Sequence, residues 1–276
     1  MKRILIPMDF TEVSNNALTY ALQMFDMERI YITHSTFGSY HLDSKDEEPR
    51  VNKKQILTTE LTEEVLKIMR QDKLPENISI HILKGDILPS TKKFVEENNI
   101  SAVVMGTRDK YTLFDKWIGT TSLSIVKTLK IPVYLIPPFS KFREFKNVLV
   151  ASDFHLGNKQ LVDELKNWNM SYGAFIRFLH IQDENKKDFE LEKNTIVDSF
   201  YENEEPHFGF EIISKKSKDI SQSLLASAYN YNSDIIIAAP DNQNFINSLL
   251  FRSVTKDLIL KSEIPLLFLH SEKIIS

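Results

Sequence analysis

Two strand-like segments of this chain each occur a second time further along the sequence. Residues 2–10 (KRILIPMDF) reappear as residues 146–154 (KNVLVASDF), and residues 131–136 (IPVYLI) reappear as residues 264–269 (IPLLFL). Each segment contains an apolar run of the length of a buried strand. The distance between the copies far exceeds the roughly 20–50 residues of a solenoid repeat, so the pattern predicts two tandem domains.

Within the first copy, apolar runs of strand length alternate with segments whose apolar residues recur at helical spacing. The predicted strands cover residues 2–8, 29–35, 78–83, 101–105 and 131–136. Such alternation is typical of a parallel sheet with helices on both faces. We therefore predict an α/β fold with two domains, residues 1–139 and residues 145–276, each built on a five-stranded parallel sheet. Right-handed crossovers limit such a sheet to a few doubly wound orders, and ligands bind where the strand order reverses. We predict this reversal between the first and fourth strands.

The composition excludes several classes of function. Lys and Arg number 34 and Asp and Glu number 38, so a formal net charge of −4 gives no basic surface for nucleic acid or for a membrane. No run approaches the roughly 18 apolar residues that a membrane span needs. The chain has no cysteine, and its seven histidines show no metal-binding spacing. We expect a cytoplasmic protein without a metal site that binds neither nucleic acid nor a membrane.

The stretch 100–137 contains the residues that indicate a ligand. A short apolar strand ends at Gly106, a polar loop follows, and Gly119 precedes three hydroxyl residues at the start of a predicted helix. Free backbone N–H groups and the helix dipole attract anions to such a helix end, and Gly119 would let a phosphate approach the backbone. The alternative is ordinary helix capping. The residues of this predicted phosphate seat are Gly106, Gly119, Thr120, Thr121 and Ser122.

The spacing of these residues resembles a known signature. Gly106, two residues, Asp109, nine residues and Gly119 followed by a threonine are similar to the G-x2-G-x9-G-(S/T) nucleotide-binding motif of the universal stress protein family. Asp109 stands where that motif has its middle glycine. Residues 4–12 and 131–136 resemble the first and last strands of the family. The chain thus resembles a tandem universal stress protein (UspA-like), which implies two Rossmann-like domains of the flavodoxin-like, adenine nucleotide alpha hydrolase-like type.

The same resemblance implies a ligand, a set of contacts and an assembly. The ligand would be an adenine nucleotide, ATP or AMP, with or without Mg²⁺. The nucleotide-binding residues implied are Pro7, Asp9, Ser35, Met105, Gly106, Arg108, Asp109, Gly119, Thr120, Thr121 and Ser122. The two domains would pair through their last strands as an intramolecular pseudo-dimer. Two such chains could in turn form a homodimer. For Asp9, capping of the first helix is an alternative role that does not exclude ligand contact.

Asp109 is the departure that bears most on binding. A carboxylate in the loop around the phosphates adds like charge, which Mg²⁺ or the adjacent Arg108 and Lys110 would have to neutralise. Aspartate tolerates a left-handed backbone, so the shape of the loop can persist without the glycine. The sequence leaves open whether Asp109 abolishes binding.

The second copy lacks the glycines of the first. Its loop 242–250 contains none, and Arg252 aligns with Gly119. We predict that this domain has lost the nucleotide loop, because a bulky side chain stands where the backbone would approach phosphate. The alternative is that Arg252 supplies a charge to an anion held elsewhere.

These features lead to two hypotheses of different classes. The first is a stress-response protein that binds or senses adenine nucleotide through its N-terminal domain only. The second is an interaction scaffold in which both loops have lost ATP binding, and Asp109, Arg252 and the glycine-free loop favour it. We expect no catalytic residue and no enzyme, since weak ATP hydrolysis would need a base positioned for water that the sequence does not identify.

Overall fold

A computed structural model describes most of the chain and divides it into two compact units, Met1–Phe142 and Arg143–Ser276. The predicted domains, residues 1–139 and 145–276, place the division within three residues of this boundary on either side. The described residues are 2–25, 28–36, 51–107, 120–151, 159–183, 208–238 and 249–269.

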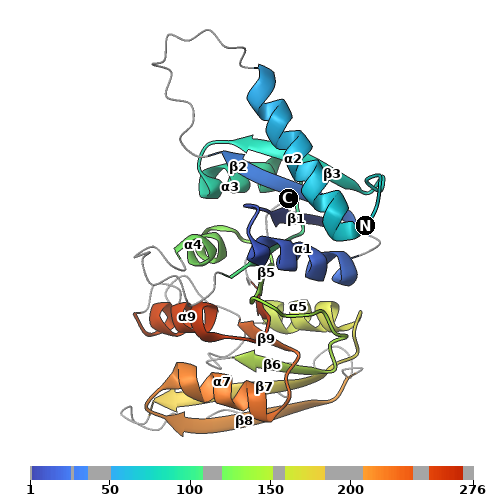
Figure 1. The fold of residues 1–276 in the computed structure, drawn as a ribbon. Helices are drawn as coiled ribbons and strands as arrows, with labels where there is room; N and C mark the ends of the chain where they lie inside the picture. Colours follow the sequence, from blue (N-terminus) through green and yellow to red (C-terminus); the bar gives the residue numbers. More distant parts are fainter. Residues whose placement is uncertain are drawn as a thin grey trace. The chain divides into compact units, whose positions relative to one another are not determined.

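The first unit is a parallel sheet with strand order β3-β2-β1-β4-β5 (Figure 1). Its strands are β1 (Arg3–Pro7), β2 (Arg29–Thr36), β3 (Ile78–Lys84), β4 (Ala102–Gly106) and β5 (Val133–Ile136). Its helices are α1 (Glu12–Met24), α2 (Val51–Met69), α3 (Ile87–Glu97) and α4 (Thr120–Thr128). The predicted α/β alternation and the five parallel strands are confirmed.

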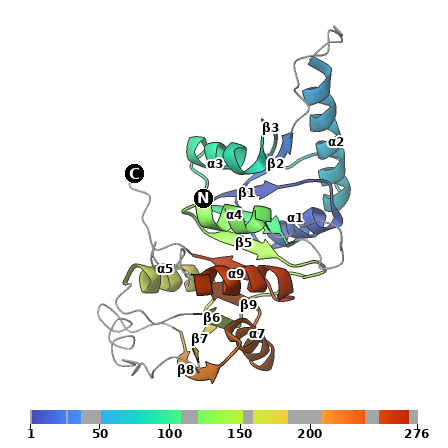
Figure 2. The same cartoon turned by 90° about the vertical axis from the view of Figure 1, so that its left-hand side faces the viewer.

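Two helical layers cover the sheet of this unit. Helices α1 and α2 contact each other on one face, and α3 and α4 contact each other on the opposite face (Figure 2). The central strand β1 is covered on both sides, and Ile4, Leu5 and Ile6 are fully buried. Consecutive buried apolar residues are what a strand between two helical layers requires. The edge strand β3 is only partly buried, because it has a neighbour on one side alone.

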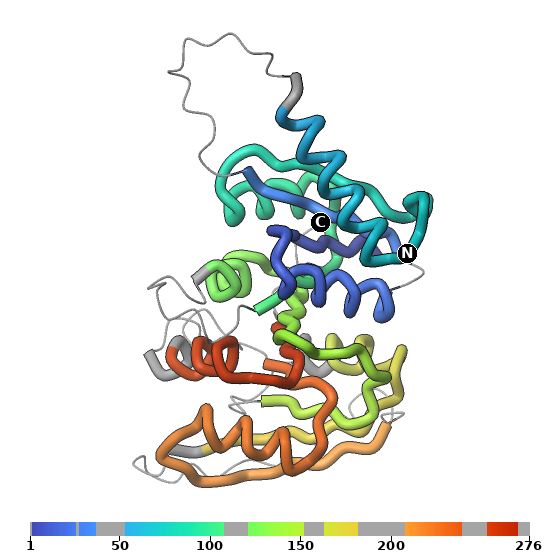
Figure 3. Tube along the Cα trace, in the orientation of Figure 1, coloured from blue at the N-terminus to red at the C-terminus, as the bar shows by residue number. Residues whose placement is uncertain are grey.

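Helix α2 extends past the sheet that it covers. Leu61 and Val65 in its second half are fully buried, whereas residues 53–56 in its first turns are exposed. The trace shows these first turns projecting beyond the strands (Figure 3). The packing of α2 therefore rests on its C-terminal half.

The second unit repeats the strand order of the first. Its sheet runs β10-β9-β6-β7-β8, again with all strands parallel. The strands are β6 (Asn147–Ala151), β7 (Phe175–Asp183), β8 (Phe210–Ser217), β9 (Ile235–Ala238) and β10 (Leu266–Phe268). The helices are α5 (Lys159–Asn169), α7 (Ile220–Asn230) and α9 (Leu249–Lys261). The central β6 lies between β7 and β9 just as β1 lies between β2 and β4.

Candidate functional site

Strands β1 and β4 of the first unit run side by side, and their carboxyl ends form the candidate site. The pairing sets Leu5 opposite Val103, so Pro7 and Gly106 end the two strands side by side, at the edge of the sheet formed by the carboxyl ends of its strands. The chain order of the strands reverses here, because β2 and β3 lie on one side of β1 and β4 and β5 on the other. Parallel α/β sheets bind ligands at such a point. The predicted position of the reversal is confirmed.

Gly106 lies against the first turn of α1. A Cβ at this position would stand 2.5 Å from Cγ1 of Val13 and 2.8 Å from its backbone oxygen. Both distances are shorter than atoms tolerate, so a side chain at residue 106 would displace the helix. The absence of a side chain is thus explained by packing alone, and it brings α1 within contact of the end of β4.

Asp9 organises the turn between β1 and α1. One oxygen of its carboxylate accepts hydrogen bonds from the backbone N–H of Thr11 at 3.2 Å and from the Thr11 hydroxyl at 2.5 Å. Thr11 in turn caps α1, because its Oγ1 accepts from the backbone N–H of Ser14 at 3.2 Å. The capping role considered for Asp9 therefore belongs to Thr11, and Asp9 holds the capping residue. Asp9 itself is exposed to solvent at the sheet edge.

Phe10, the next residue, adopts a left-handed backbone conformation with φ of 63°. Its ring lies 4.9 Å from the His34 imidazole, centroid to centroid, with the planes inclined by 60°. His34 stands near the end of β2 and hydrogen-bonds the Met8 carbonyl oxygen through Nδ1 at 2.9 Å. These contacts give His34 a packing and hydrogen-bonding role. The involvement of Phe10 has no sequence signal, since a bulky residue seldom takes a positive φ.

Ser35 follows His34 and joins β2 to the start of α3. Its hydroxyl lies 3.0 Å from that of Ser90, which donates to the Asp86 carbonyl oxygen at 2.6 Å. Ser35 therefore lies at the same edge as Pro7 and Asp9, and its hydroxyl is engaged in a contact between strand and helix. A role for Ser35 in holding adenosine stays a prediction.

The predicted phosphate seat is described only in part. Met105 is buried at the end of β4, and α4 begins at Thr120, as the hydroxyl run predicts. Within α4, Thr121 is exposed and Ser122 is buried. The start of α4 leaves its first backbone N–H groups without a partner inside the helix. Arg108, Asp109 and Gly119 lie outside the described residues.

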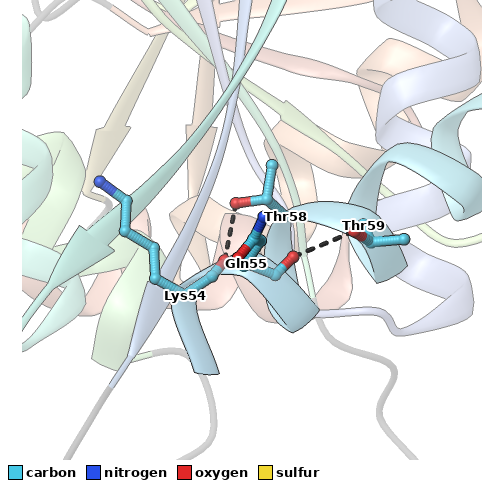
Figure 4. Close-up of a pocket in the computed structure, with 4 residues that line it drawn as sticks. All are labelled: Lys54, Gln55, Thr58 and Thr59. Carbon is cyan, nitrogen blue, oxygen red and sulfur yellow. Dashed lines mark hydrogen bonds between the residues drawn. The ribbon is translucent and has the colours of Figure 1, made fainter. Parts of the chain in front are cut away.

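A separate open groove of about 300 Å³ runs along the first turns of α2 and is lined by Lys54, Gln55, Thr58 and Thr59 (Figure 4). The Thr58 hydroxyl donates to the Lys54 carbonyl oxygen at 2.7 Å, and the Thr59 hydroxyl donates to that of Gln55 at 3.0 Å. Both hydroxyl protons are thus engaged by the helix itself. None of the predicted binding residues lines this groove.

In the second unit, most of the residues on which the predicted loss of nucleotide binding depends lie outside the described residues. Of the predicted glycine-free loop 242–250, residues 242–248 lie outside the described residues, whereas residues 249 and 250 belong to α9. The aspartate that matches Asp9 also lies outside the described residues. Arg252 belongs to α9, but its side chain is not among those described. His180 stands in β7 at the place that matches His34 in β2. The predicted loss of the second nucleotide loop stays a prediction.

The described part of the chain contains no group of three or more His, Asp or Glu side chains that could hold a metal ion. Across the same described ranges, no helix is both long enough and apolar enough to cross a membrane.

The fold defines the class of this protein: a doubly wound α/β protein whose strand order reverses between β1 and β4, the point at which such folds bind ligands. Residues 1–137 match the model of the universal stress protein family. The chain belongs to the universal stress protein family through this first half. No curated protein matches the sequence.

Solved structures share the arrangement over nearly the whole chain. A universal stress protein from Archaeoglobus fulgidus DSM 4304 has a TM-score of 0.72 and 19% identity, covering 98% of each chain. A functionally unknown protein from Pseudomonas aeruginosa PAO1 has a TM-score of 0.57 and 9% identity, covering 98% of this chain and 92% of that one. At these identities the likeness shows the fold. A universal stress protein from Archaeoglobus fulgidus in complex with dAMP aligns at a TM-score of 0.34 and 14% identity, covering 46% of this chain and 98% of that one.

Proposed function

We propose that the first unit binds an adenine nucleotide, ATP or AMP, and that the chain acts as a stress-associated nucleotide-binding or sensing protein. The supporting observation is the adjacency of β1 and β4, which sets Pro7 and Gly106 at one edge of the sheet. Membership of residues 1–137 in the universal stress protein family adds to it.

The phosphates would lie at the beginning of α4. Helix α4 starts at Thr120, directly after Gly119 in the sequence. The free backbone N–H groups and the positive end of the helix dipole at this start would attract the phosphates. Where Mg²⁺ accompanies the nucleotide, it would bind the phosphate oxygens. The adenosine would extend from there along the ends of β1 and β2, near Asp9.

We propose binding without turnover. Hydrolysis would require a base within hydrogen-bonding reach of a water molecule beside the terminal phosphate. The carboxylate of Asp9, which lies at this edge, already accepts two hydrogen bonds from Thr11 and serves the turn before α1.

One observation favours the scaffold as a second candidate function. The contact of Gly106 with Val13 explains this glycine without any ligand, so its presence does not require a phosphate nearby. This contact, together with Asp109 and Arg252 at two glycine positions of the motif, is consistent with a chain that has retained the fold and lost nucleotide binding.

The test is isothermal titration of the whole chain with ATP and with AMP, each with and without Mg²⁺. The proposal predicts close to one nucleotide per chain, and loss of binding in Gly119→Arg, which places the residue of the second copy in the first. Asp109→Gly, which restores the family motif, is the matched variant and should bind more tightly. If neither the chain nor Asp109→Gly binds at millimolar nucleotide, the scaffold becomes the better account.

A further inference from the structure

Strand β3 is an edge strand that carries no charge along most of its length. Among the described residues it pairs with β2 alone, so one row of its backbone groups has no strand beside it. Residues 78–83 are Ile-Ser-Ile-His-Ile-Leu, and only Lys84 at the end of the strand is charged. Burial lowers the pKa of His81, as do the charges of Arg29 and Lys54, so the imidazole is neutral at neutral pH. An uncharged edge of this kind is a template for another strand.

The corresponding edge strand of the second unit, β8, has the protection that β3 lacks. Each of these strands is the outer neighbour of the second strand of its unit, so the two are equivalent in the repeat. Within its eight residues β8 carries three charged side chains, Glu211, Lys215 and Lys216. Charged residues on an edge strand are a common defence against pairing with another chain. The two copies of the fold therefore differ in how their edges are protected.

The backbone of β3 determines which of its residues face outward. The N–H of Ile30 in β2 donates to the carbonyl oxygen of Asn77 at 2.8 Å, and the strands pair with Ile30 opposite Ile78. Bonds alternate along a parallel ladder, so the N–H and C=O groups of Ile78, Ile80 and Ile82 point away from β2. The open backbone groups of this edge therefore belong to the three isoleucines.

The side chains of these isoleucines lie together on one face of the sheet. His81 contacts Phe94 of α3, with 5.1 Å between ring centroids, so the odd-numbered side chains of β3 face α3. Side chains alternate along a strand, so the isoleucines face the side that α2 covers, and the last two are only half-buried there. Glu76 stands two residues before the first isoleucine and Lys84 two residues after the last, both exposed. The order along this edge is thus one acid, three isoleucines and one base.

Antiparallel pairing with a second copy would match this order with itself. A two-fold axis at Ile80 sets this residue opposite its own copy and Ile78 opposite Ile82. The same axis sets Glu76 opposite Lys84 at both ends. Apolar pairs and opposite charges across two strands each stabilise a sheet, and here the open backbone groups of one strand would meet those of the other. Shifting the axis by one residue either way would set an isoleucine opposite a charged side chain.

Helix α2 extends over the same edge. Its first turns project past β3 in both views of the fold (Figures 1 and 2), so a strand added to β3 would lie beside them. Ile56 in these turns is 46% exposed, although it is a large apolar residue. A two-fold axis through β3 would place the two α2 helices on the same face of the joined sheet, antiparallel to each other. The partner would thus meet an apolar side chain as well as the open strand.

We propose that two copies of this chain join through β3, with the two strands antiparallel about Ile80 and the sheets of their first units continuous. This inference goes beyond nucleotide binding and does not depend on it. A closed two-fold dimer needs one surface that is complementary to itself, and the acid, isoleucine and base order of β3 supplies it. The face of the sheet that β3 borders is left unchanged, because the new bonds form at its edge only.

The experiment measures the mass of the whole chain by sedimentation over a range of concentrations. We expect the parent to rise from its chain mass of 32.1 kDa toward twice this value. Ile80→Pro should abolish the dimer, because proline removes an outward N–H and is tolerated on an edge strand when no bond to the neighbouring strand is lost. Ile212→Pro is the matched control. It removes the equivalent outward N–H of β8 and should leave the dimer intact.

A charge exchange tests the pairing about Ile80 without altering the core, since Glu76 and Lys84 are both exposed. Lys84→Glu sets a carboxylate opposite Glu76 at both ends of the interface and should weaken the dimer roughly 5- to 30-fold. The double variant, Glu76→Lys with Lys84→Glu, exchanges the two charges and should restore the affinity of the parent.

Several results would overturn the proposal. A parent that stays monomeric would leave β3 without a second copy and open to an extended segment of another protein. A dimer that persists in Ile80→Pro must use another surface, and equal loss in Ile80→Pro and Ile212→Pro would show that the effect is not specific to β3. If Ile80→Pro does not fold, the charge exchange decides, and a double variant as weak as Lys84→Glu would contradict the pairing. None of these results depends on whether the chain binds ATP.

Discussion

Replacement of Gly106 by alanine should destabilise the first unit through its contact with Val13. The added Cβ would meet the valine Cγ1 at 2.5 Å, its carbonyl oxygen at 2.8 Å and its carbonyl carbon at 3.1 Å. A side-chain atom can rotate away, but the two backbone atoms move only if the first turn of α1 moves. That turn is held by the Thr11 cap, so the strain cannot relax freely.

The expected loss of stability follows from two opposing effects. Forcing a methyl group into a well-packed site costs about 1–3 kcal/mol. Alanine also restricts the unfolded chain more than glycine does, which stabilises the folded state by about 0.4–1 kcal/mol where alanine can adopt the native φ. Gly106 is such a position, because it is not among the residues with positive φ. The net expectation is a loss of about 1–2 kcal/mol, and each kcal/mol lowers the midpoint by roughly 2–4 °C in a domain of this size.

The assay is thermal and urea unfolding of four proteins: the parent, Gly106→Ala, Val13→Ala and the double variant. Val13→Ala removes the closest atom but leaves the carbonyl oxygen at 2.8 Å, so the double variant should recover only part of the loss. An unchanged midpoint in Gly106→Ala would refute the reasoning, because it would show that α1 yields without cost. Full recovery in the double variant would show that the backbone contact is unimportant.

Three further predictions concern other parts of the fold. Thr11→Ala removes the cap of α1 and should cost about 1 kcal/mol in urea unfolding, whereas Thr11→Ser should retain most of it. Asn169 is buried and holds both the N–H and the carbonyl oxygen of Ala174 at 2.9 Å, so Asn169→Ala should cost about 2–3 kcal/mol; a loss below 0.5 kcal/mol would contradict this. Burial raises the pKa of Glu164 from 4.5 to about 7, so the folded chain keeps this proton longer than the unfolded chain and stability falls as the pH rises from 4.5 to about 7. Glu164→Gln should therefore match the parent near pH 4 and exceed it in stability at pH 8, and equal midpoints at pH 8 would show that this carboxyl ionises without penalty.

Much of the fold could be predicted because it depends on local apolar patterning. The predicted strands at 29–35 and 78–83 each differ from β2 and β3 by one residue. Fully buried strands appear as continuous apolar runs, and right-handed crossovers leave few alternatives for the order of a parallel sheet. The repeated segments 2–10 and 146–154 predict that the second sheet copies the first, as the strand orders show.

The candidate site was less predictable because its contacts join elements that are distant in the sequence. Gly106 is adapted to Val13, more than ninety residues earlier in the chain, and no local pattern indicates that pairing. The left-handed conformation of Phe10 contradicts its local preference, and its ring contacts His34 of another strand. Thr11 is a residue type that commonly caps helices, but the hydrogen bonds by which Asp9 holds it are not indicated by any pattern in the sequence.

Hydrogen–deuterium exchange of the whole chain, with and without saturating ATP, would show whether nucleotide binds at the first unit and not at the second. We expect slower exchange at the ends of β1 and β4 and at the start of α4, with β6, β9 and α9 unchanged. Protection confined to the second unit, or equal in both units, would contradict it.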